Sequence, residues 1–206
     1  MKEHNILGVI LAGGKSSRFG SNKSLSKLAN NKLIEHVINK IESYFPKILI
    51  VSNDSNLKIE NKKIKIIKDC IEGYLGPLAG VLSAIKYANS YKNKYKWIIT
   101  FPCDTPFFNR IIIKKMFEKI NLAEEKIYFI KEKKQRHNIF GMWSTSLEKT
   151  LEDDLNNNFR KVDLWADKIG CSFIEKDVQN KNEFLNINTK EDLELAKKIY
   201  KKNDFI

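Results

Sequence analysis

Residues 6–23 read ILGVILAGGKSSRFGSNK, and this stretch decides the fold. Its first six residues form a short apolar run rich in β-branched side chains, which predicts a strand buried on both faces. Gly13-Gly14 follows the run and ends the strand. Glycines at this place let the backbone approach a ligand and turn its N–H groups towards an anion. We therefore expect a sheet with a phosphate-binding loop at the carboxyl end of its first strand.

Strand and helix patterns alternate along the rest of the chain. Short apolar runs predict further strands at 48–52, 64–67, 97–101, 127–130 and 138–143, and apolar residues at helical spacing predict helices at 31–44, 78–88 and 111–120. The region 147–206 is expected to hold helices around one short strand at 184–187, with a last helix at 191–200. This order predicts an α/β fold, a single Rossmann-like domain over residues 1–206 with a mostly parallel sheet flanked by helices.

Composition and charge exclude several classes of protein. Hydrophobic residues make up 42% and charged residues 30% of the 206 residues, as in a globular chain, and no stretch approaches the roughly 20 apolar residues that span a bilayer. The net charge of +12 suits a nucleic-acid binder, but the lysines are spread over the whole chain, which indicates solvated surface. Three distant cysteines without a CxxC pair favour a reducing compartment. We expect a cytoplasmic protein without a nucleic-acid or membrane partner.

The loop after the first strand also carries two cations, Arg18 and Lys23. It is not a Walker A motif, because Ser21-Asn22 separates Gly20 from Lys23. The alternative is a tight turn with surface cations. Fixed positive charges over a glycine turn directly after a buried strand favour phosphate binding instead.

A single aspartate, Asp104, follows the expected strand at 97–101, in the sequence Pro102-Cys103-Asp104-Thr105-Pro106. Two prolines hold it rigidly where ligands of parallel sheets bind, beyond the carboxyl ends of the strands. Mg²⁺ takes only one or two protein carboxylates when phosphate oxygens and waters complete its shell. Asp104 is therefore the expected Mg²⁺ ligand, although an aspartate before Thr-Pro also suits an ordinary turn.

A third pattern is Asp69 followed by GPLAG at 76–80. Gly76-Pro77 opens a helix whose positive end could face an anion or a base, and Gly80 permits close packing. Taken alone, this pattern fits a plain helix start equally well.

Four motifs occur in one order: LAGGxxxRxGxxK at 11–23, GPLAG at 76–80, PCDTP at 102–106 and FLNINTKEDL at 184–193. The set resembles the molybdenum cofactor guanylyltransferase family and spans nearly the whole chain. The first motif marks only the wider nucleotidyltransferase superfamily, and the other three point more narrowly. The chain departs from the family pattern at Asn22, where the family often has an aspartate, and His137-Asn138 matches the family's His-Pro strand only in part.

The resemblance implies transfer of GMP from GTP to the terminal phosphate of molybdopterin, which yields the guanine dinucleotide cofactor and pyrophosphate. Implied partners are GTP, molybdopterin or the Mo cofactor, and other cofactor-biosynthesis or acceptor proteins, with Mg²⁺ as cofactor. Leu11, Ala12, Gly13 and Lys23 would contact GTP, Asn53 and Asp69 would lie nearer the nucleoside, and Asn186 and Asn188 on the acceptor side. With the residue patterns above, the expected catalytic residues are Arg18, Lys23 and Asp104; the expected substrate-binding residues are Leu11, Ala12, Gly13, Gly14, Lys23, Asn53, Asp69, Gly76, Gly80, Asp104, Asn186 and Asn188.

Three alternatives remain open at this point. The first is a transferase of the same superfamily that uses CTP or a sugar or alditol phosphate acceptor, which the glycine loop cannot separate. The second is a nucleotide-binding regulator without catalysis, against which the pair of Asp104 and Lys23 argues. The third is a nucleic-acid binder, which the absence of interleaved aromatic and basic residues disfavours.

Overall fold

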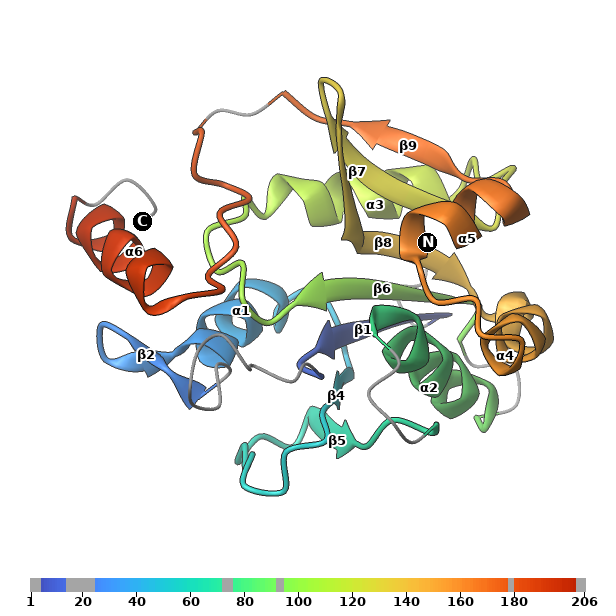
Figure 1. Cartoon of the computed structure of the whole chain (residues 1–206), viewed down its shortest axis with the longest axis horizontal. Helices are drawn as coiled ribbons and strands as arrows, with labels where there is room; N and C mark the ends of the chain where they lie inside the picture. Colours follow the sequence, from blue (N-terminus) through green and yellow to red (C-terminus); the bar gives the residue numbers. More distant parts are fainter. Residues whose placement is uncertain (1–4, 14–24, 72–75, 92–94, 178–179, 203–206) are drawn as a thin grey trace.

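The computed structural model of the chain describes residues 5–13, 25–71, 76–91, 95–177 and 180–202 (Figure 1). The strands of its main sheet are β1 (Ile6–Leu11), β4 (Ile48–Val51), β5 (Ile64–Ile67), β6 (Trp97–Pro102), β7 (Ile127–Glu132), β8 (Gln135–Ser144) and β9 (Ser172–Glu175). They form a seven-stranded sheet in the order β5-β4-β1-β6-β8-β7-β9. All neighbouring pairs are parallel except those of β8, which runs antiparallel to β6 and β7. The expected α/β fold with a mostly parallel sheet is confirmed.

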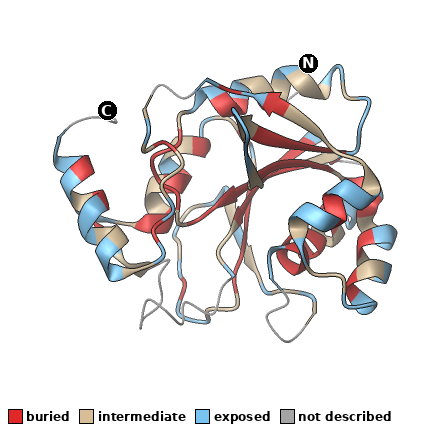
Figure 2. Cartoon of the chain, turned by 45° about the horizontal axis from the view of Figure 1, so that its top comes forward, coloured by how far each residue is buried: buried red, intermediate tan, exposed pale blue. Residues whose placement is uncertain are grey.

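Helices cover both faces of this sheet (Figure 1). They are α1 (Leu33–Ile41), α2 (Pro77–Asn89), α3 (Ile111–Ile120), α4 (Glu148–Asn156), α5 (Val162–Ile169) and α6 (Lys190–Lys201), with a 3₁₀ turn, η3, at Thr145–Leu147. A hairpin of β2 (Lys27–Leu28) and β3 (Asn31–Lys32) precedes α1. The apolar residues of α1 and α3 pack into one core, and those of α2, α4 and α5 pack into another on the opposite face. Figure 2 shows the buried strands between these layers.

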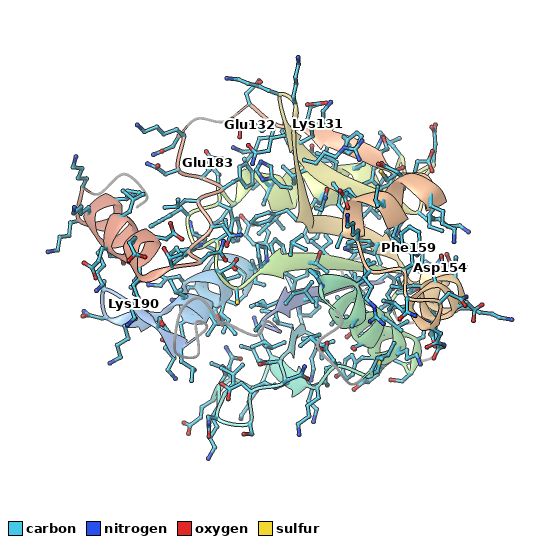
Figure 3. The ribbon with its side chains drawn as sticks, viewed as in Figure 1. Lys131, Glu132, Asp154, Phe159, Glu183 and Lys190 are labelled. Atoms are coloured by element: carbon cyan, nitrogen blue, oxygen red, sulfur yellow. The ribbon has the colours of Figure 1, made fainter. Side chains whose placement is uncertain are left out.

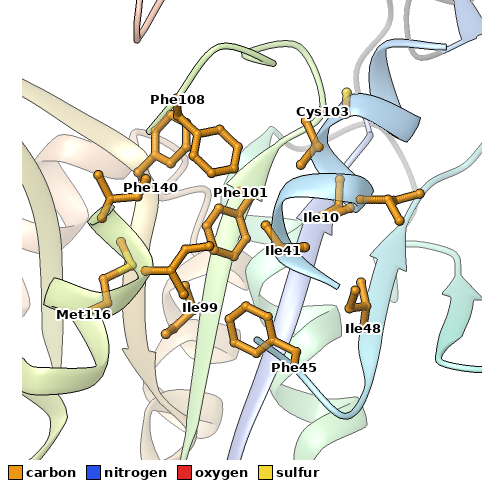
Figure 4. Packing of buried hydrophobic residues seen from close by; sticks show 14 of the residues in the cluster. Ile10, Ile41, Phe45, Ile48, Ile99, Phe101, Cys103, Phe108, Met116 and Phe140 are labelled. Carbon is orange, nitrogen blue, oxygen red and sulfur yellow. The ribbon is translucent and has the colours of Figure 1, made fainter. Parts of the chain in front are cut away.

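The alternating side chains of the central strands explain the two cores. On β1, Ile6 and Ile10 face the core that holds α1 and α3, whereas Leu7 and Val9 face the core that holds α2. Because successive side chains of a strand point to opposite faces, a strand that is apolar at every position must be covered on both sides. Figure 4 shows the first core, in which Phe101 of β6 stacks on Phe108 with ring centroids 5.6 Å apart.

The helix starts follow from local chemistry. Thr189 caps α6 by accepting a hydrogen bond from the Asp192 N–H, and the Asp192 carboxylate accepts one from the Thr189 N–H in return. Pro77 occupies the first turn of α2, where no N–H is needed, and Gly76 before it has a φ of 82° that favours glycine.

Several elements differ from the sequence expectation. Strands β7 and β8 are longer than the strands expected at 127–130 and 138–143. The helix expected at 31–44 is shorter, because Asn31 and Lys32 pair with β2 before α1 begins. The prediction of a strand at 184–187 was wrong: among the described residues after 147 the strand is β9, which pairs with β7 at the edge of the sheet. Residues 184–187 instead cross the carboxyl end of the sheet, where the Ile187 N–H donates to the Asp104 carbonyl.

The strand order positions a ligand crevice. The chain goes from β1 to β4 and β5 on one side, then crosses to β6 on the other side of β1. Ligands bind at such a switch point, beyond the carboxyl ends of the strands. Within the described part of the chain, no helix combines the length and apolar character needed to cross a membrane.

Candidate active site

Backbone hydrogen bonds bring four loops together at the carboxyl edge of the sheet. The Ala12 N–H donates to the Val51 carbonyl (2.9 Å), the Ser52 N–H to the Ile67 carbonyl (2.9 Å), and the Cys103 N–H to the Leu11 carbonyl (3.2 Å). Each bond extends the parallel pairing beyond the end of a strand. The loops after β1, β4, β5 and β6 therefore start side by side, and these loops carry Gly13, Asn53, Asp69 and Asp104.

Asn53 and Asp69 are locked together by two hydrogen bonds. The Asn53 amide Nδ2 donates to Asp69 Oδ2 (2.8 Å), and the Asp69 backbone N–H donates to Asn53 Oδ1 (3.0 Å). Burial raises the pKa of the Asp69 carboxyl, and the hydrogen bond from Asn53 opposes that shift. The second carboxylate oxygen, Oδ1, is buried and has no hydrogen-bond partner among the described residues. An orphaned buried acceptor at a ligand crevice is suited to a donor on a ligand.

Glycines make room around this carboxylate. A Cβ atom at Gly13 would lie 3.4 Å from Asp69 Oδ2, and one at Gly80 would lie 3.0 Å from Leu11 Cδ2 and 3.6 Å from Asp69 Oδ1. The first turn of α2, which contains Gly80, thus packs closely against both the end of β1 and Asp69. Gly76 contributes differently, through its backbone conformation, since a Cβ there would meet nothing within 4 Å.

A serine ties the Asp69 loop to α2. The Ser83 hydroxyl accepts a hydrogen bond from the Cys70 N–H (2.8 Å) and donates to the Ala79 carbonyl (2.7 Å). Ser83 is buried, so these bonds are shielded from water. The orientation of Asp69 is therefore set by Asn53 on one side and by α2 on the other.

Asp104 lies half-buried beyond the end of β6. Its Oδ1 accepts a hydrogen bond from the Thr105 hydroxyl (3.2 Å), and its carbonyl accepts one from the Ile187 N–H (2.9 Å). Ile187 is buried, whereas Asn186 and Asn188 on either side of it are exposed. The structure thereby brings the backbone of the Asn186–Asn188 stretch beside Asp104, although these residues are far apart in the sequence.

The other expected site residues lie outside the described residues. They are Gly14, Arg18 and Lys23, so their roles stay predictions from the sequence. Among the described residues, no three acidic, cysteine or histidine side chains gather in a way that could hold a metal ion. Asp104 offers a carboxylate oxygen, and this donor fits Mg²⁺ when a polyphosphate supplies further oxygens.

One feature of this edge was missed by the sequence reasoning. The His137 ring of β8 stacks on Phe184, with ring centroids 3.7 Å apart and an interplanar angle of 19°. Burial, reinforced by the nearby positive charge of Lys176, lowers the pKa of His137 to about 4. No spacing rule links a histidine on one strand with an aromatic residue so far along the chain, so only the fold could reveal the pair.

Known proteins resemble this chain over most of its length. Residues 8–166 match the MobA-like NTP transferase domain. A molybdenum cofactor guanylyltransferase of Shewanella halifaxensis is 31% identical over 184 residues, covering 89% of each chain. The enzyme of the same name from Yersinia pseudotuberculosis is 32% identical over 194 residues, covering 93% of this chain and 94% of that protein.

Solved structures agree on the fold. The molybdopterin-guanine dinucleotide biosynthesis protein A of Archaeoglobus fulgidus superimposes with a TM-score of 0.79 at 21% identity, over 95% of this chain and 99% of that one. The 2-C-methyl-D-erythritol 4-phosphate cytidylyltransferase of Francisella tularensis gives a TM-score of 0.70 at 19% identity, over 93% of this chain and 98% of that one. At these identities the likeness concerns the fold alone. The resemblance drawn from the four sequence motifs is nevertheless confirmed by the family match and the relatives, and the chain belongs to the MobA-like NTP transferase family of nucleotidyltransferases.

Proposed function

We propose that this protein transfers GMP from GTP to the terminal phosphate of molybdopterin, giving the guanine dinucleotide cofactor and pyrophosphate. One structural observation carries the proposal. Asp104 stands at the carboxyl edge of the sheet between the Asn53–Asp69 pair and the Asn186–Asn188 stretch, which is attached to it through Ile187. We assign the Asn53–Asp69 pair to the nucleotide side, Asp104 to the centre and the Asn186–Asn188 stretch to the acceptor side. The relatives at about 30% identity are named molybdenum cofactor guanylyltransferases, which supports the choice of a guanylyl donor and a molybdenum cofactor acceptor.

On the nucleotide side, Leu11, Ala12 and Gly13 lead into the glycine loop. Asp69 Oδ1 offers a buried acceptor to an N–H or O–H group of the nucleoside, because its partner oxygen is already engaged by Asn53. Gly13 and Gly80 keep the space around the carboxylate free of side-chain atoms. Arg18 and Lys23 are proposed to neutralise the triphosphate and the leaving pyrophosphate.

At the centre, Asp104 is proposed to hold Mg²⁺, which would offset the charge that develops at the α-phosphorus. An acceptor phosphate is already ionised at neutral pH, so no general base is required. An oxygen of that phosphate attacks the α-phosphorus in line, the bond from the α-phosphorus to the bridging oxygen breaks, and pyrophosphate leaves with the bond electrons. Catalysis by this chain then consists of positioning and electrostatic stabilisation.

We extend the proposal to the domain organisation, the cellular compartment and the protein partners. We treat residues 1–206 as one catalytic domain and the cytoplasm as its compartment, which suits the cysteines Cys70, Cys103 and Cys171, since these three form no disulfide. Other cofactor-biosynthesis or acceptor proteins are the proposed protein partners, since the product has to be handed on.

Pyrophosphate release from each of the four NTPs tests the function, with Mg²⁺ and with or without a molybdopterin-bearing acceptor. We expect release from GTP alone, dependent on both Mg²⁺ and the acceptor. Release from CTP, or only with a sugar or alditol phosphate, would keep the nucleotidyltransferase mechanism and overturn the named substrates. Binding of GTP without any release would instead support a nucleotide-binding regulator.

A further inference from the structure

A buried ion pair lies outside the residues assigned to nucleotide chemistry. Lys176 and Glu183 form a salt bridge, and their side chains are only 2% and 3% exposed. Lys176 Nζ also donates to the Asp177 carbonyl (3.3 Å). Removing two charges from water costs free energy that their attraction repays only in good geometry, so a buried pair is a weak device for stability alone. The position of the pair in the fold indicates a different role.

The pair joins the sheet to the acceptor side. Lys176 directly follows β9, and its backbone N–H donates to the Lys131 carbonyl of β7 (3.0 Å), so this residue belongs to the rigid edge of the sheet. Glu183 directly precedes Phe184 and the Asn186–Asn188 stretch. In Figure 3 Glu183 lies on the connection that leads from β9 towards α6, near the β7–β8 hairpin that carries Glu132.

Aromatic packing also attaches the start of the 184–188 stretch to the sheet. Phe184 is stacked on His137, and its ring is 5.3 Å from that of Phe140, in an edge-on arrangement. Lys176 Nζ lies 5.8 Å from the centre of the Phe184 ring, within the range of a cation–π contact. Glu183 also faces Lys40 of α1, and this interaction partly offsets the lowering of the Lys40 pKa by burial and by Arg110. One carboxylate thus interacts with lysines from two elements.

The stretch between these contacts and α6 is also held near its middle. The Ile187 N–H donates to the Asp104 carbonyl, and the Leu185 N–H donates to the Asn182 carbonyl. The buried Ile187 side chain packs in a small core cluster with residues of the β2–α1 region and of α6. At the far end of the stretch the Asn188 N–H donates to Asp192 Oδ2 (2.9 Å), and Thr189 caps α6. The place of Asn186 and Asn188 relative to Asp104 is consequently set at both ends, by the Lys176–Glu183 pair and by the start of α6, and between them by Ile187.

We propose that Lys176 and Glu183 are positioning residues for the acceptor: by fixing the start of the 184–188 stretch, they hold Asn186 and Asn188 at the distance from Asp104 that acceptor binding requires. The assignment of that stretch to the acceptor rests on the proposed function. The attachment of the stretch through Lys176 and Glu183 does not rest on it and can be tested separately.

Amide hydrogen exchange tests this attachment of the stretch on the full chain without substrates. Glu183→Gln removes one charge of the pair, and Lys86→Met is the matched control, since it removes a lysine from the far more exposed Lys86–Glu152 pair between α2 and α4. We expect the Ile187 amide to exchange at least about tenfold faster in Glu183→Gln than in the wild type and the control, with the amides of β1 and β6 unchanged. Unchanged exchange at Ile187 in a folded Glu183→Gln protein would overturn the proposal.

A second variant covers the case in which Glu183→Gln does not fold. Lys176→Met combined with Glu183→Leu removes both charges, so no unpaired charge stays buried, and such replacements of ion pairs generally preserve folding. We expect this double variant to fold and still to show faster exchange at Ile187. Exchange at the wild-type rate would mean that any packed pair serves as well, which contradicts a specific role for the ion pair.

Steady-state kinetics tests the link to the acceptor. In the folded variant we expect KM for the molybdopterin-bearing acceptor to rise about tenfold while the Kd for GTP changes less than about twofold, as for the loss of a contact on one substrate side only. A parallel loss of GTP affinity, or an unchanged acceptor KM, would overturn the positioning role. Absence of turnover in the wild type would count against the proposed function and would leave the exchange result standing.

Discussion

Asp69 and Asp104 lie at the same edge of the sheet, yet their surroundings differ. Asp69 is bound to Asn53 through one carboxylate oxygen and has its other oxygen buried without a partner among the described residues, and burial raises its pKa. Asp104 is half-buried beyond β6, with Thr105 and Ile187 as hydrogen-bond donors to it. Different surroundings suit different roles, nucleoside recognition for Asp69 and metal binding for Asp104. Two residue substitutions separate these roles.

Asp104→Asn keeps the size of the side chain and removes its charge. We expect kcat for acceptor-dependent pyrophosphate release to fall at least about a hundredfold, because one essential electrostatic element is lost. Affinity for GTP should fall less than turnover. Asp163→Asn, at an exposed position of α5, is the control and should retain wild-type turnover. Near-normal kcat in Asp104→Asn would refute the metal assignment.

Asp69→Asn tests the nucleoside contact. A hydrogen bond to a charged group contributes about 1.5–3 kcal/mol, so we expect the Kd for GTP to rise roughly 10-fold to 100-fold. Calorimetric titration measures this directly, with Asp163→Asn again as the control. Two analogues identify the donor group on GTP: inosine triphosphate lacks the 2-amino group of guanine, and 2′-deoxyguanosine triphosphate lacks the 2′-hydroxyl group. The analogue without the group that donates to Asp69 should lose less affinity in the variant than GTP does. Equal GTP binding by wild type and variant would contradict the assignment.

Among the elements, β1 is approached closely by Phe45, and the sequence of the strand does not predict this contact. A Cβ atom on Gly8 would lie 2.7 Å from Cγ of Phe45, and Phe45 is almost fully buried against Phe101 and Phe117. The glycine therefore lets the segment after α1 pack onto the middle of the strand. Its role is in packing.

Gly8→Ala should lower the free energy of unfolding by about 1–3 kcal/mol, as expected when a methyl group is forced into a packed core. Urea unfolding measures the change. Phe45→Leu should cost less in the Gly8→Ala background than in the wild type, because the smaller side chain relieves the clash. Simple additivity of the two changes would show that this contact is not the cause.

For the whole molecule, His137 couples stability to pH. Its pKa is about 4 in the folded protein, because burial and Lys176 disfavour the charged ring and outweigh Glu132, whose Oε2 lies 3.8 Å from Nε2. In the unfolded chain a histidine has a pKa of about 6.5, so between these values the unfolded chain binds more protons. The stabilisation is fully present above pH 6.5 and is lost as the pH falls towards 4.

We expect the free energy of unfolding of the wild type to decrease by roughly 2 kcal/mol between pH 7 and pH 5 through this residue. His137→Gln cannot titrate, so it should show a correspondingly flatter dependence in urea unfolding over the same range. Matching slopes for the two proteins would exclude His137 as the source.

The sequence by itself determined the fold class and the positions of Asp69 and Asp104 directly after strands of the sheet. Apolar runs and helical spacing are local signals, and they located β1, β4, β5, β6, α2 and α3 to within a residue or two. The predictions for Asp69 and Asp104 rested equally on local context, since each follows a strand whose carboxyl end must meet its neighbours in a parallel sheet. The order of the four motifs pointed to the family, because the periodicity of strands and helices carries no information about family membership.

Only the tertiary structure decided the contacts between distant segments. The apolar run at 184–187 is as strand-like as β9, but β9 occupies the edge beside β7, and Phe184 finds its partner in His137 instead. The Lys176–Glu183 pair and the hydrogen bond from Ile187 to Asp104 depend on the same packing. Local propensity cannot choose between partners that are apart in the chain and compete for one surface, because that choice depends on the total burial and pairing of the folded molecule.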